Sequence, residues 1–301
     1  MIDRAEYPFE SRYLPLAAGR MHYVDEGQGR PVVLVHGTPT WSFMYRHLIK
    51  GLSPVVRCIA PDHLGFGLSD QPAGGDCSPK AHARNLAELI ERLELRDITL
   101  VVHDFGGPIG LSYAIEHPRN VRQIVMFNTW LWSLKDQWMY KLVAGLARGP
   151  LGGLLFERLG LEERVIMPAA YGDRRRLTRA IHQHYLRPHA TPQARRSTRE
   201  LARHLIDSSD WYASLWERNG RLRTMPALVL WGMRDTVFPP KTLDRWRTTL
   251  LDAQIMTFDD VGHFVPEEKG QELVPVVRYF LEHGPSQFGQ QIVGEAGNFK
   301  R

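Results

Sequence analysis

The chain has few cysteines and lacks long apolar runs. Only Cys58 and Cys77 are present, and neither belongs to a metal-binding pair, so we expect no structural disulfide. No stretch is long and apolar enough to span a bilayer, and the N-terminal residues MIDRAEYPFESRYLPL do not form a secretory signal. We therefore expect a cytoplasmic protein that uses neither a metal ion nor another cofactor.

The composition is that of an ordinary globular protein with a small excess of positive charge. Of its 301 residues, 43% are hydrophobic and 24% are charged, enough for one core with an inserted subdomain. The formal net charge is +5, and arginines cluster in GDRRRLTRA (172–180) and ARRSTRELARHL (194–205). Base-stacking aromatics do not separate them, so we expect a solvated basic face and no nucleic-acid partner. Contact of this face with a membrane surface or an acidic partner stays open.

Short β-branched runs alternate with helical patterns along most of the chain. Apolar residues recur at helical spacing in HARNLAELIERLEL (82–95), and a second helix is predicted from about Pro108. Strands are predicted in PVVLVHG (31–37), VVRCIAP (55–61), ITLVVHD (98–104), VRQIVMFN (121–128), ALVLWGMRD (227–235) and QIMTFDDVGH (254–263). This alternation predicts an α/β fold with a mostly parallel sheet and helices on both faces.

The alternation stops between residues 129 and 224. That segment has helical periodicity and many tryptophans and arginines. We interpret it as a helical cap, inserted into a core formed by residues 1–128 and 225–301. Such a cap would cover the carboxyl ends of the strands, where open α/β sheets bind ligands.

Asp104 stands where a strand gives way to a helix. The surrounding VHDFG (102–106) resembles the nucleophile elbow G-x-S-x-G, with valine for the first glycine and aspartate for the serine. Gly106 and Gly107 are the small neighbours that such a turn needs, and the Phe105 N–H would face the reacting atom. On this motif alone, an ordinary helix N-cap aspartate fits equally well.

Two later motifs supply an acid and a histidine. Asp235 in LVLWGMRD and His263 in DDVGH each follow a predicted strand. The order of nucleophile, acid and histidine is that of α/β-hydrolase triads, so we predict Asp104, Asp235 and His263 as catalytic residues. The loop HGTPTW (36–41) follows an early strand, and its Thr38 N–H is predicted to complete an oxyanion hole with the N–H of Phe105.

Together these motifs resemble the haloalkane dehalogenase branch of the α/β-hydrolase superfamily. The resemblance spans about residues 10–284 and is carried by VVHDFGGPIGL, HGTPTWSFMYR, APDHLGFGLSD, LWGMRD and VGHFVPEE. Within that branch the sequence is most similar to the β-lactone decarboxylases of bacterial long-chain olefin biosynthesis. The resemblance implies an α/β-hydrolase fold, a hydrophobic small-molecule substrate and other olefin-pathway enzymes as partners. Some members place the acid after the strand that corresponds to VMFN. This chain has Asn128 there, which is not a carboxylate, so we assign the acid to Asp235.

An aspartate at the elbow suits attack on a saturated carbon. Asp104 is a carboxylate at neutral pH and can form an alkyl ester with a substrate that bears a leaving group. A water molecule activated by His263 can then attack the ester carbonyl, and the oxyanion hole stabilises the charge that develops.

Two positions depart from the dehalogenase pattern. Dehalogenases hold the departing halide with a tryptophan after the nucleophile and often an asparagine after HG, whereas this chain has Phe105 and Thr38. A buried anion without hydrogen bonds is costly, so we expect a leaving group other than halide. A β-lactone fits, because its carboxylate stays attached after attack at the alkyl carbon, and loss of carbon dioxide gives an alkene. Attack at the acyl carbon is an equally drawable route.

The substrate pocket is expected to include Trp41, Asn128, Trp130 and Trp132. The candidates for an indole donor are Trp130, Trp132, Trp138, Trp211 and Trp216, although core packing is the more frequent role for any one of them. Haloalkane dehalogenase is the alternative function, followed by epoxide hydrolase. An epoxide hydrolase needs cap tyrosines to protonate the alkoxide, and the candidates are Tyr140, Tyr171, Tyr185 and Tyr212. The histidine-rich IHQHYLRPH (181–189) lacks nearby acids, so we interpret it as a solvated helix face and not as a metal site.

Overall fold

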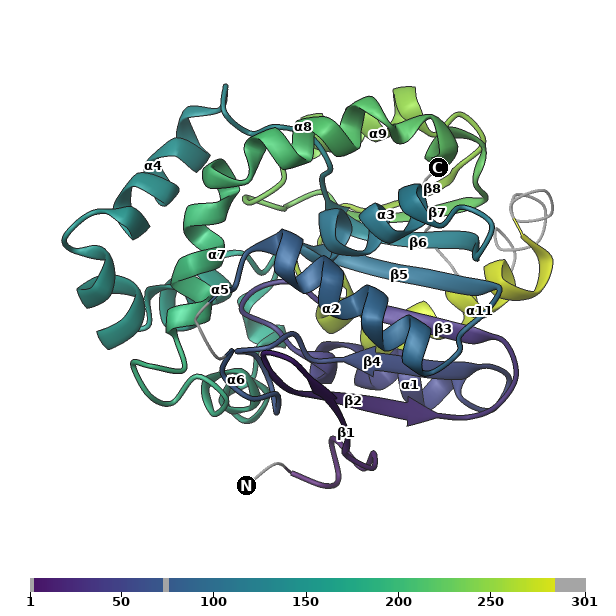
Figure 1. Ribbon diagram of the computed structural model, residues 1–301, viewed down its shortest axis with the longest axis horizontal. Coiled ribbons are helices and arrows are strands. Elements are labelled where there is room, and N and C mark those ends of the chain that lie inside the picture. Colours follow the sequence, from purple (N-terminus) through teal and green to yellow (C-terminus); the bar gives the residue numbers. More distant parts are fainter. Residues whose placement is uncertain (1–2, 73–75, 285–301) are drawn as a thin grey trace.

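One eight-stranded sheet runs through the protein (Figure 1). A computed structural model describes residues 3–72 and 76–284. The strand order is β1-β2-β4-β3-β5-β6-β7-β8, and only the pairs β1–β2 and β2–β4 are antiparallel. The strands are β1 (Arg12–Leu16), β2 (Gly19–Glu26), β3 (Pro31–Val35), β4 (Arg57–Pro61), β5 (Ile98–Asp104), β6 (Val121–Thr129), β7 (Ala227–Gly232) and β8 (Gln254–Phe258).

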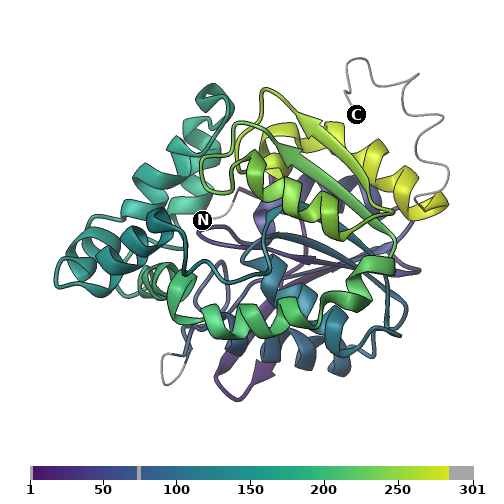
Figure 2. The same ribbon diagram turned by 90° about the horizontal axis from the view of Figure 1, so that it is seen from above.

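Helices cover both faces of this sheet. Figure 2 shows α11 in yellow on one side and the blue-to-teal helices α2 and α3 on the other. The helices of the core are α1 (Arg46–Leu52), α2 (Pro79–Arg92), α3 (Gly106–Glu116), α9 (Pro240–Thr249), α10 (Val265–Lys269) and α11 (Leu273–His283), with short turns η1 (Ser42–Tyr45) and η6 (Gly270–Glu272). The predicted α/β architecture with a mostly parallel sheet is confirmed.

Alternation along each strand divides the apolar side chains between two cores. In β5, Leu100 and Val102 pack with helices α2 and α3, whereas Val101 packs with α1 and α11. Successive side chains of a strand point to opposite faces, so a strand covered on both faces must be apolar throughout. Every residue of β5 is buried, which explains why Leu100, Val101 and Val102 are apolar without alternation.

Between β6 and β7 all regular secondary structure is helical. All residues from 130 to 226 are described, and they form α4 (Trp138–Arg148), η2 (Gly153–Arg158), η3 (Glu162–Ile166), α5 (Met167–Ala169), η4 (Arg174–Arg176), α6 (Arg179–Leu186), α7 (Arg196–Asp207), α8 (Ser209–Glu217) and η5 (Asn219–Thr224). Helices α4, α5 and α7 lie beyond the carboxyl ends of the central strands (Figure 1). This is the region predicted as the cap. The end of the predicted core segment, from residue 285, lies outside the described residues.

The histidine-rich segment of the cap is not a solvated helix face, so that prediction is wrong. His184 and His189 are both buried. The ring of His184 stacks on Phe43 with centroids 4.3 Å apart, and its carbonyl oxygen accepts a hydrogen bond from Trp41 Nε1 at 3.0 Å. These aromatic contacts join α6 to the core, and they outweigh the polarity that the sequence pattern suggests.

The two arginine clusters are also more internal than predicted. Arg195 is buried and donates to the Glu157 carbonyl oxygen at 2.7 Å. Arg199 pairs with the Glu157 carboxylate at 2.7 Å, and Arg176 pairs with Asp260 at 2.7 Å. Part of the positive charge therefore ties cap segments together or to the core. No helix among the described residues is both long and apolar enough to cross a bilayer.

Candidate active site

Asp104 occupies a tight turn between β5 and α3. Its φ angle is 53°, a left-handed conformation that residues other than glycine rarely adopt. A Cβ atom on Gly106 would lie 2.1 Å from the Val35 carbonyl oxygen, and one on Gly107 would lie 1.8 Å from Thr129 Oγ1. Thr129 Oγ1 donates a hydrogen bond of 2.6 Å to the Asp104 carbonyl oxygen. Glycine at both positions lets the chain turn sharply and present Asp104 at the edge of the sheet.

The Asp104 carboxylate does not cap the following helix. Helix α3 has Phe105 as its N-cap and no side-chain cap, so the interpretation of Asp104 as an N-cap residue does not hold. Instead, the Thr38 N–H donates to Asp104 Oδ1 at 2.9 Å, and the Phe105 amide acts on the same carboxylate and lowers its pKa. The two amides predicted for the oxyanion hole therefore both contact the Asp104 side chain. Amide donors at this place can stabilise an oxyanion that forms on an Asp104 ester.

His263 lies between two carboxylates. Its Nδ1 is 2.9 Å from Asp235 Oδ2, and its Nε2 is 3.5 Å from Asp104 Oδ2. All three side chains are buried. Asp104 ends β5, Asp235 follows β7 and His263 follows β8, and parallel strands end at the same edge of a sheet. The structure thus brings together the three predicted catalytic residues in the geometry that a nucleophile, a base and an orienting acid require.

Asp235 is held by donors on both of its oxygens. Its Oδ1 accepts from the N–H groups of Val237 at 2.6 Å and Phe238 at 2.9 Å. Its Oδ2 accepts from Asn128 Nδ2 at 2.7 Å as well as facing His263. Asn128, predicted as a pocket residue, therefore lies behind the acid. It supports the position and charge of Asp235.

The free site favours an ionised nucleophile. Burial by itself raises the pKa of Asp104, but the neighbouring His263 and the Phe105 amide outweigh burial and hold the pKa below its ordinary value of 3.8. Asp104 is therefore a carboxylate at neutral pH, the form that attacks an electrophilic carbon.

His263 is favoured in its charged form. Burial alone lowers the pKa of His263, but Asp235 and Asp104 outweigh burial and raise the pKa to about 10. Formation of an ester on Asp104 would neutralise one of these two carboxylates. The pKa of His263 would then fall, and the ring could act as a base only after the first covalent step.

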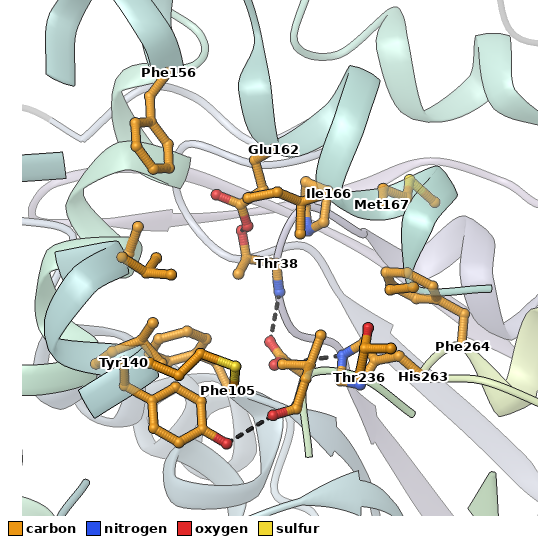
Figure 3. Close-up of a pocket in the computed structure, with 18 residues that line it drawn as sticks. Thr38, Phe105, Tyr140, Phe156, Glu162, Ile166, Met167, Thr236, His263 and Phe264 are labelled. Atoms are coloured by element: carbon orange, nitrogen blue, oxygen red, sulfur yellow. Dashed lines mark hydrogen bonds and ion pairs between the residues drawn. The ribbon is translucent and has the colours of Figure 1, made fainter. Parts of the chain in front are cut away.

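A cavity of about 230 Å³ opens beside Asp104 and His263 (Figure 3). Its walls come from the core loops and from α4, η2, η3, α5 and α7 of the cap. They are mainly apolar, and the side chains include Met139, Val143, Phe156, Ile166, Met167 and Leu205. A cavity of this character suits a hydrophobic substrate.

The four residues predicted to form the substrate pocket do not line this cavity. Besides Asn128, these are three buried tryptophans. Trp41 donates its indole N–H to the cap, Trp130 packs edge-on against Phe105 with centroids 4.9 Å apart, and Trp132 packs against Trp216. All three rings are buried, and large aromatic side chains contribute strongly to the packing of a core. That part of the pocket prediction is wrong for this cavity.

Of the four cap tyrosines considered for epoxide chemistry, Tyr140 alone lines this cavity. Its hydroxyl donates to the Val237 carbonyl oxygen at 2.6 Å (Figure 3). Burial raises the pKa of Tyr171 well above 10, and the Tyr171 hydroxyl is buried without a hydrogen-bond partner. The predicted arrangement of tyrosines that protonate an alkoxide is therefore absent from this cavity.

Glu162 is a cavity residue that the sequence analysis missed. It lies in η3, is only 6% exposed and accepts a hydrogen bond from the Thr38 hydroxyl on Oε1 at 2.7 Å. Burial, then the nearby Glu163 and Asp104, raise its pKa well above 4.5 against the opposing effect of Thr38. The signal in the sequence is a Glu-Glu pair within the mainly apolar stretch LLFERLGLEERVIM (154–167). Within the described part of the chain, no three His, Cys, Asp or Glu side chains are placed to hold a metal ion.

Comparison with known proteins places this fold and site in a family. The sequence model for the alpha/beta hydrolase fold matches residues 30–270. The chain therefore belongs to the α/β-hydrolase family, and its relatives place it in the haloalkane dehalogenase-like branch. It is an enzyme of this fold, as the sequence analysis predicted.

Curated relatives with two different activities are about equally similar to this chain. Haloalkane dehalogenase 2 of Mycobacterium tuberculosis is 36% identical over 277 residues, covering 91% of this chain and 96% of the relative. A cis-3-alkyl-4-alkyloxetan-2-one decarboxylase of Xanthomonas campestris is 35% identical over 298 residues, covering 93% and 98%. The solved structure of the haloalkane dehalogenase DatA from Agrobacterium tumefaciens matches with a TM-score of 0.83 at 23% identity, covering 93% and 99%, which supports the fold.

Proposed function

We propose that this enzyme converts a cis-β-lactone with two alkyl substituents into an alkene and carbon dioxide through a covalent ester of Asp104. One observation carries the proposal: the side chain of Phe105, directly after the nucleophile, cannot donate a hydrogen bond to a halide. The Thr38 hydroxyl is already committed to Glu162. The apolar cavity and the relative with oxetanone decarboxylase activity support the same reading.

The first step is displacement at the ring carbon that bears the ring oxygen. Oδ1 of Asp104 is held by the Thr38 amide, so Oδ2, which faces His263, is the attacking atom. A bond forms from Oδ2 to the alkyl carbon, and the carbon–oxygen bond of the ring breaks with its electron pair on the oxygen. The product is an alkyl ester of Asp104 that carries a free carboxylate. Ring strain assists this step.

The second step releases both products without water. The carboxylate loses carbon dioxide, and the electron pair that remains forms the double bond. The bond between the alkyl carbon and Asp104 Oδ2 breaks at the same time, which regenerates the Asp104 carboxylate. The ring of His263, 3.5 Å from Oδ2, lies where it can stabilise the negative charge that returns to Asp104.

Hydrolysis of a haloalkane is the second candidate function. The arrangement of His263 between Asp104 and Asp235 favours it, because this arrangement can activate water once Asp104 is esterified. The two reactions share the first covalent step and differ in what removes the ester. Water removes it in dehalogenation, whereas loss of carbon dioxide removes it in the lactone reaction.

The origin of the Asp104 oxygen atoms separates the two functions. The enzyme is incubated in water enriched in heavy oxygen with a long-chain cis-β-lactone or with a 1-bromoalkane. We expect alkene and carbon dioxide from the lactone, slow halide release, and no heavy oxygen in the peptide that contains Asp104 after many turnovers of lactone. Rapid halide release with heavy oxygen in Asp104, and an untouched lactone, would instead establish the dehalogenase.

A further inference from the structure

Glu162, Thr38 and Asp104 form a connected chain of polar groups at the cavity. The Thr38 hydroxyl donates to Glu162 Oε1 at 2.7 Å, and the Thr38 N–H donates to Asp104 Oδ1 at 2.9 Å (Figure 3). Glu162 belongs to the cap, whereas Thr38 and Asp104 belong to the core. Thr38 therefore links a carboxyl group of the cap to the nucleophile. This carboxyl group lies in the wall of the cavity that the substrate would enter.

The second oxygen of Glu162 has no partner. Oε2 is buried and makes no hydrogen bond to any residue that the structure describes. A buried carboxylate without a counter-ion is strongly disfavoured, and the charged groups closest to it, Glu163 and Asp104, are themselves acids. His263 balances the charge of Asp104 from its far side. His189 lies 3.9 Å from Glu163, but burial lowers the pKa of its ring to about 4, so it supplies no positive charge at neutral pH. Glu162 is therefore favoured in its protonated form.

The hydrogen bond from Thr38 locates that proton. Oε1 already accepts the Thr38 hydroxyl, so the proton of a neutral Glu162 resides on Oε2. The result is a buried O–H group without an acceptor, which a ligand oxygen would supply. An unmade hydrogen bond of this kind costs free energy that a suitable substrate recovers on binding.

Apart from the exposed Thr236, the other polar side chains that line the cavity have their donors engaged. The Tyr140 hydroxyl donates to the Val237 carbonyl oxygen, and the two ring nitrogens of His263 face Asp235 and Asp104. The Thr38 hydroxyl bonds to Glu162. Glu162 Oε2 is thus the buried donor that stays available for a substrate.

We propose that Glu162 donates a hydrogen bond from Oε2 to the oxygen leaving group of the substrate while Asp104 attacks. This inference rests on the function proposed above and names the group that receives the departing carboxylate. When the carbon–oxygen bond of the lactone breaks, its electron pair stays on the carboxylate oxygen and the Glu162 proton stays on Oε2. Carboxylates are weak bases and need no proton transfer, whereas an alkoxide leaving group would take the proton.

Three variants test this role. Glu162→Gln keeps a hydrogen-bond donor and an acceptor for Thr38 but has no acidic proton, whereas Glu162→Leu removes both. Glu163→Gln changes the neighbouring carboxyl group, which does not line the cavity. With a long-chain cis-β-lactone we expect kcat of the leucine variant to fall about 10- to 100-fold, the loss of one hydrogen bond to a charged group. The glutamine variant stays within about tenfold of the unmodified enzyme, and Glu163→Gln has unchanged kcat.

The pH profile separates donation from a structural role. The kcat of the unmodified enzyme is expected to fall as pH rises and Glu162 loses its proton, whereas the glutamine variant lacks this decrease. Infrared difference spectra between the unmodified enzyme and Glu162→Gln are expected to contain the carbonyl band of a protonated carboxylic acid at neutral pH. This spectrum needs no substrate, so it tests the state of Glu162 even if the lactone is not the substrate.

Three results would overturn the inference. Unchanged kcat in a folded leucine variant would reduce Glu162 to a structural residue. A glutamine variant as inactive as the leucine variant would indicate proton transfer, as an alkoxide requires. An infrared spectrum of an ionised carboxylate would remove the donor itself. Alkene production by the unmodified enzyme is measured in parallel, and its absence would contradict the proposed function without bearing on the infrared result.

Discussion

Val102 packs against Gly110 of α3. It stands two residues before Asp104, where a nucleophile elbow usually has a glycine. A Cβ atom on Gly110 would lie 2.8 Å from Val102 Cγ1, closer than side chains normally approach. Gly110 lies one turn into α3, directly over β5. The larger residue in the strand is therefore accommodated by a missing side chain in the helix, and the turn at Asp104 keeps its shape.

We expect Gly110→Ala to lower the free energy of unfolding by about 1–3 kcal/mol, because the added methyl group overpacks the contact with Val102. Gly145 in α4 is a matched control, since a Cβ atom there would meet no atom within 4 Å. Gly145→Ala should stabilise the protein by up to about 1 kcal/mol through helix propensity alone. Urea unfolding measures both, and the double change Val102→Ala with Gly110→Ala should regain most of the loss. Equal effects of the two alanine substitutions would refute the steric account.

Replacing Asp104 by alanine should abolish turnover and leave the fold intact. The side chain carries the attacking oxygen, and its backbone geometry depends on the glycines around it. Mass spectrometry of the unmodified enzyme quenched during turnover should find the substrate mass on the peptide that contains Asp104. Full activity of the alanine variant would exclude a covalent mechanism at this residue.

Exchanging the acid and its amide neighbour tests which carboxylate serves His263. Asp235→Asn should lower kcat by about 10⁴-fold, since an amide holds the imidazole in the wrong tautomer. Asn128→Ala should have a smaller effect, because it removes one of three hydrogen bonds to the Asp235 carboxylate besides that of His263. The double variant Asp235→Asn with Asn128→Asp places a carboxylate on the adjacent strand and should regain part of the activity. A harmless Asp235→Asn would show that the acid lies elsewhere.

The charge of His263 makes stability depend on pH in a defined direction. Its pKa rises from 6.5 to about 10 on folding, so its contribution is fully present below about pH 6.5 and is lost as pH rises toward about 10. The difference in unfolding free energy between the unmodified enzyme and His263→Gln should therefore shrink over this range. Urea titrations across the range provide the measurement. A difference that grows with pH would mean that the ring is neutral in the folded protein.

The strands and the triad could be predicted because the signals are local. Strands β3 to β8 are apolar runs covered by helices on both faces, and Asp104, Asp235 and His263 each follow such a run. Parallel pairing then brings residues that are far apart in sequence to one edge of the sheet. Strands β1 and β2 were not predicted, because β1 is an exposed edge strand and the polar residues of β2 hide its buried segment.

The walls of the cavity could not be predicted in the same way. They come from cap helices, and which face of a cap helix is turned toward the cavity depends on tertiary packing. Glu162 is followed by Glu163 and Arg164, and a charged run within an apolar stretch does not by itself distinguish a cavity residue from a solvated one. Trp130 and Trp132 follow β6, where a pocket residue is plausible by position, but their rings fill the core. Sequence periodicity does not distinguish a packed ring from one that lines a cavity.

The hydrogen bond of 2.8 Å from the backbone N–H of His263 to the Ala170 carbonyl oxygen has an evolutionary consequence. The loop that carries His263 is tied to the cap by this bond and by the ion pair between Arg176 and Asp260, whereas most other cap contributions to the cavity are side chains on α4, η2 and α7. Mutations on those helices can reshape the space for a substrate and leave the reacting groups in register. Insertions or deletions near Ala170 would displace the base itself. Divergence of substrate range in this lineage is thus expected to accumulate in the walls, while the length of the chain around Ala170 is kept.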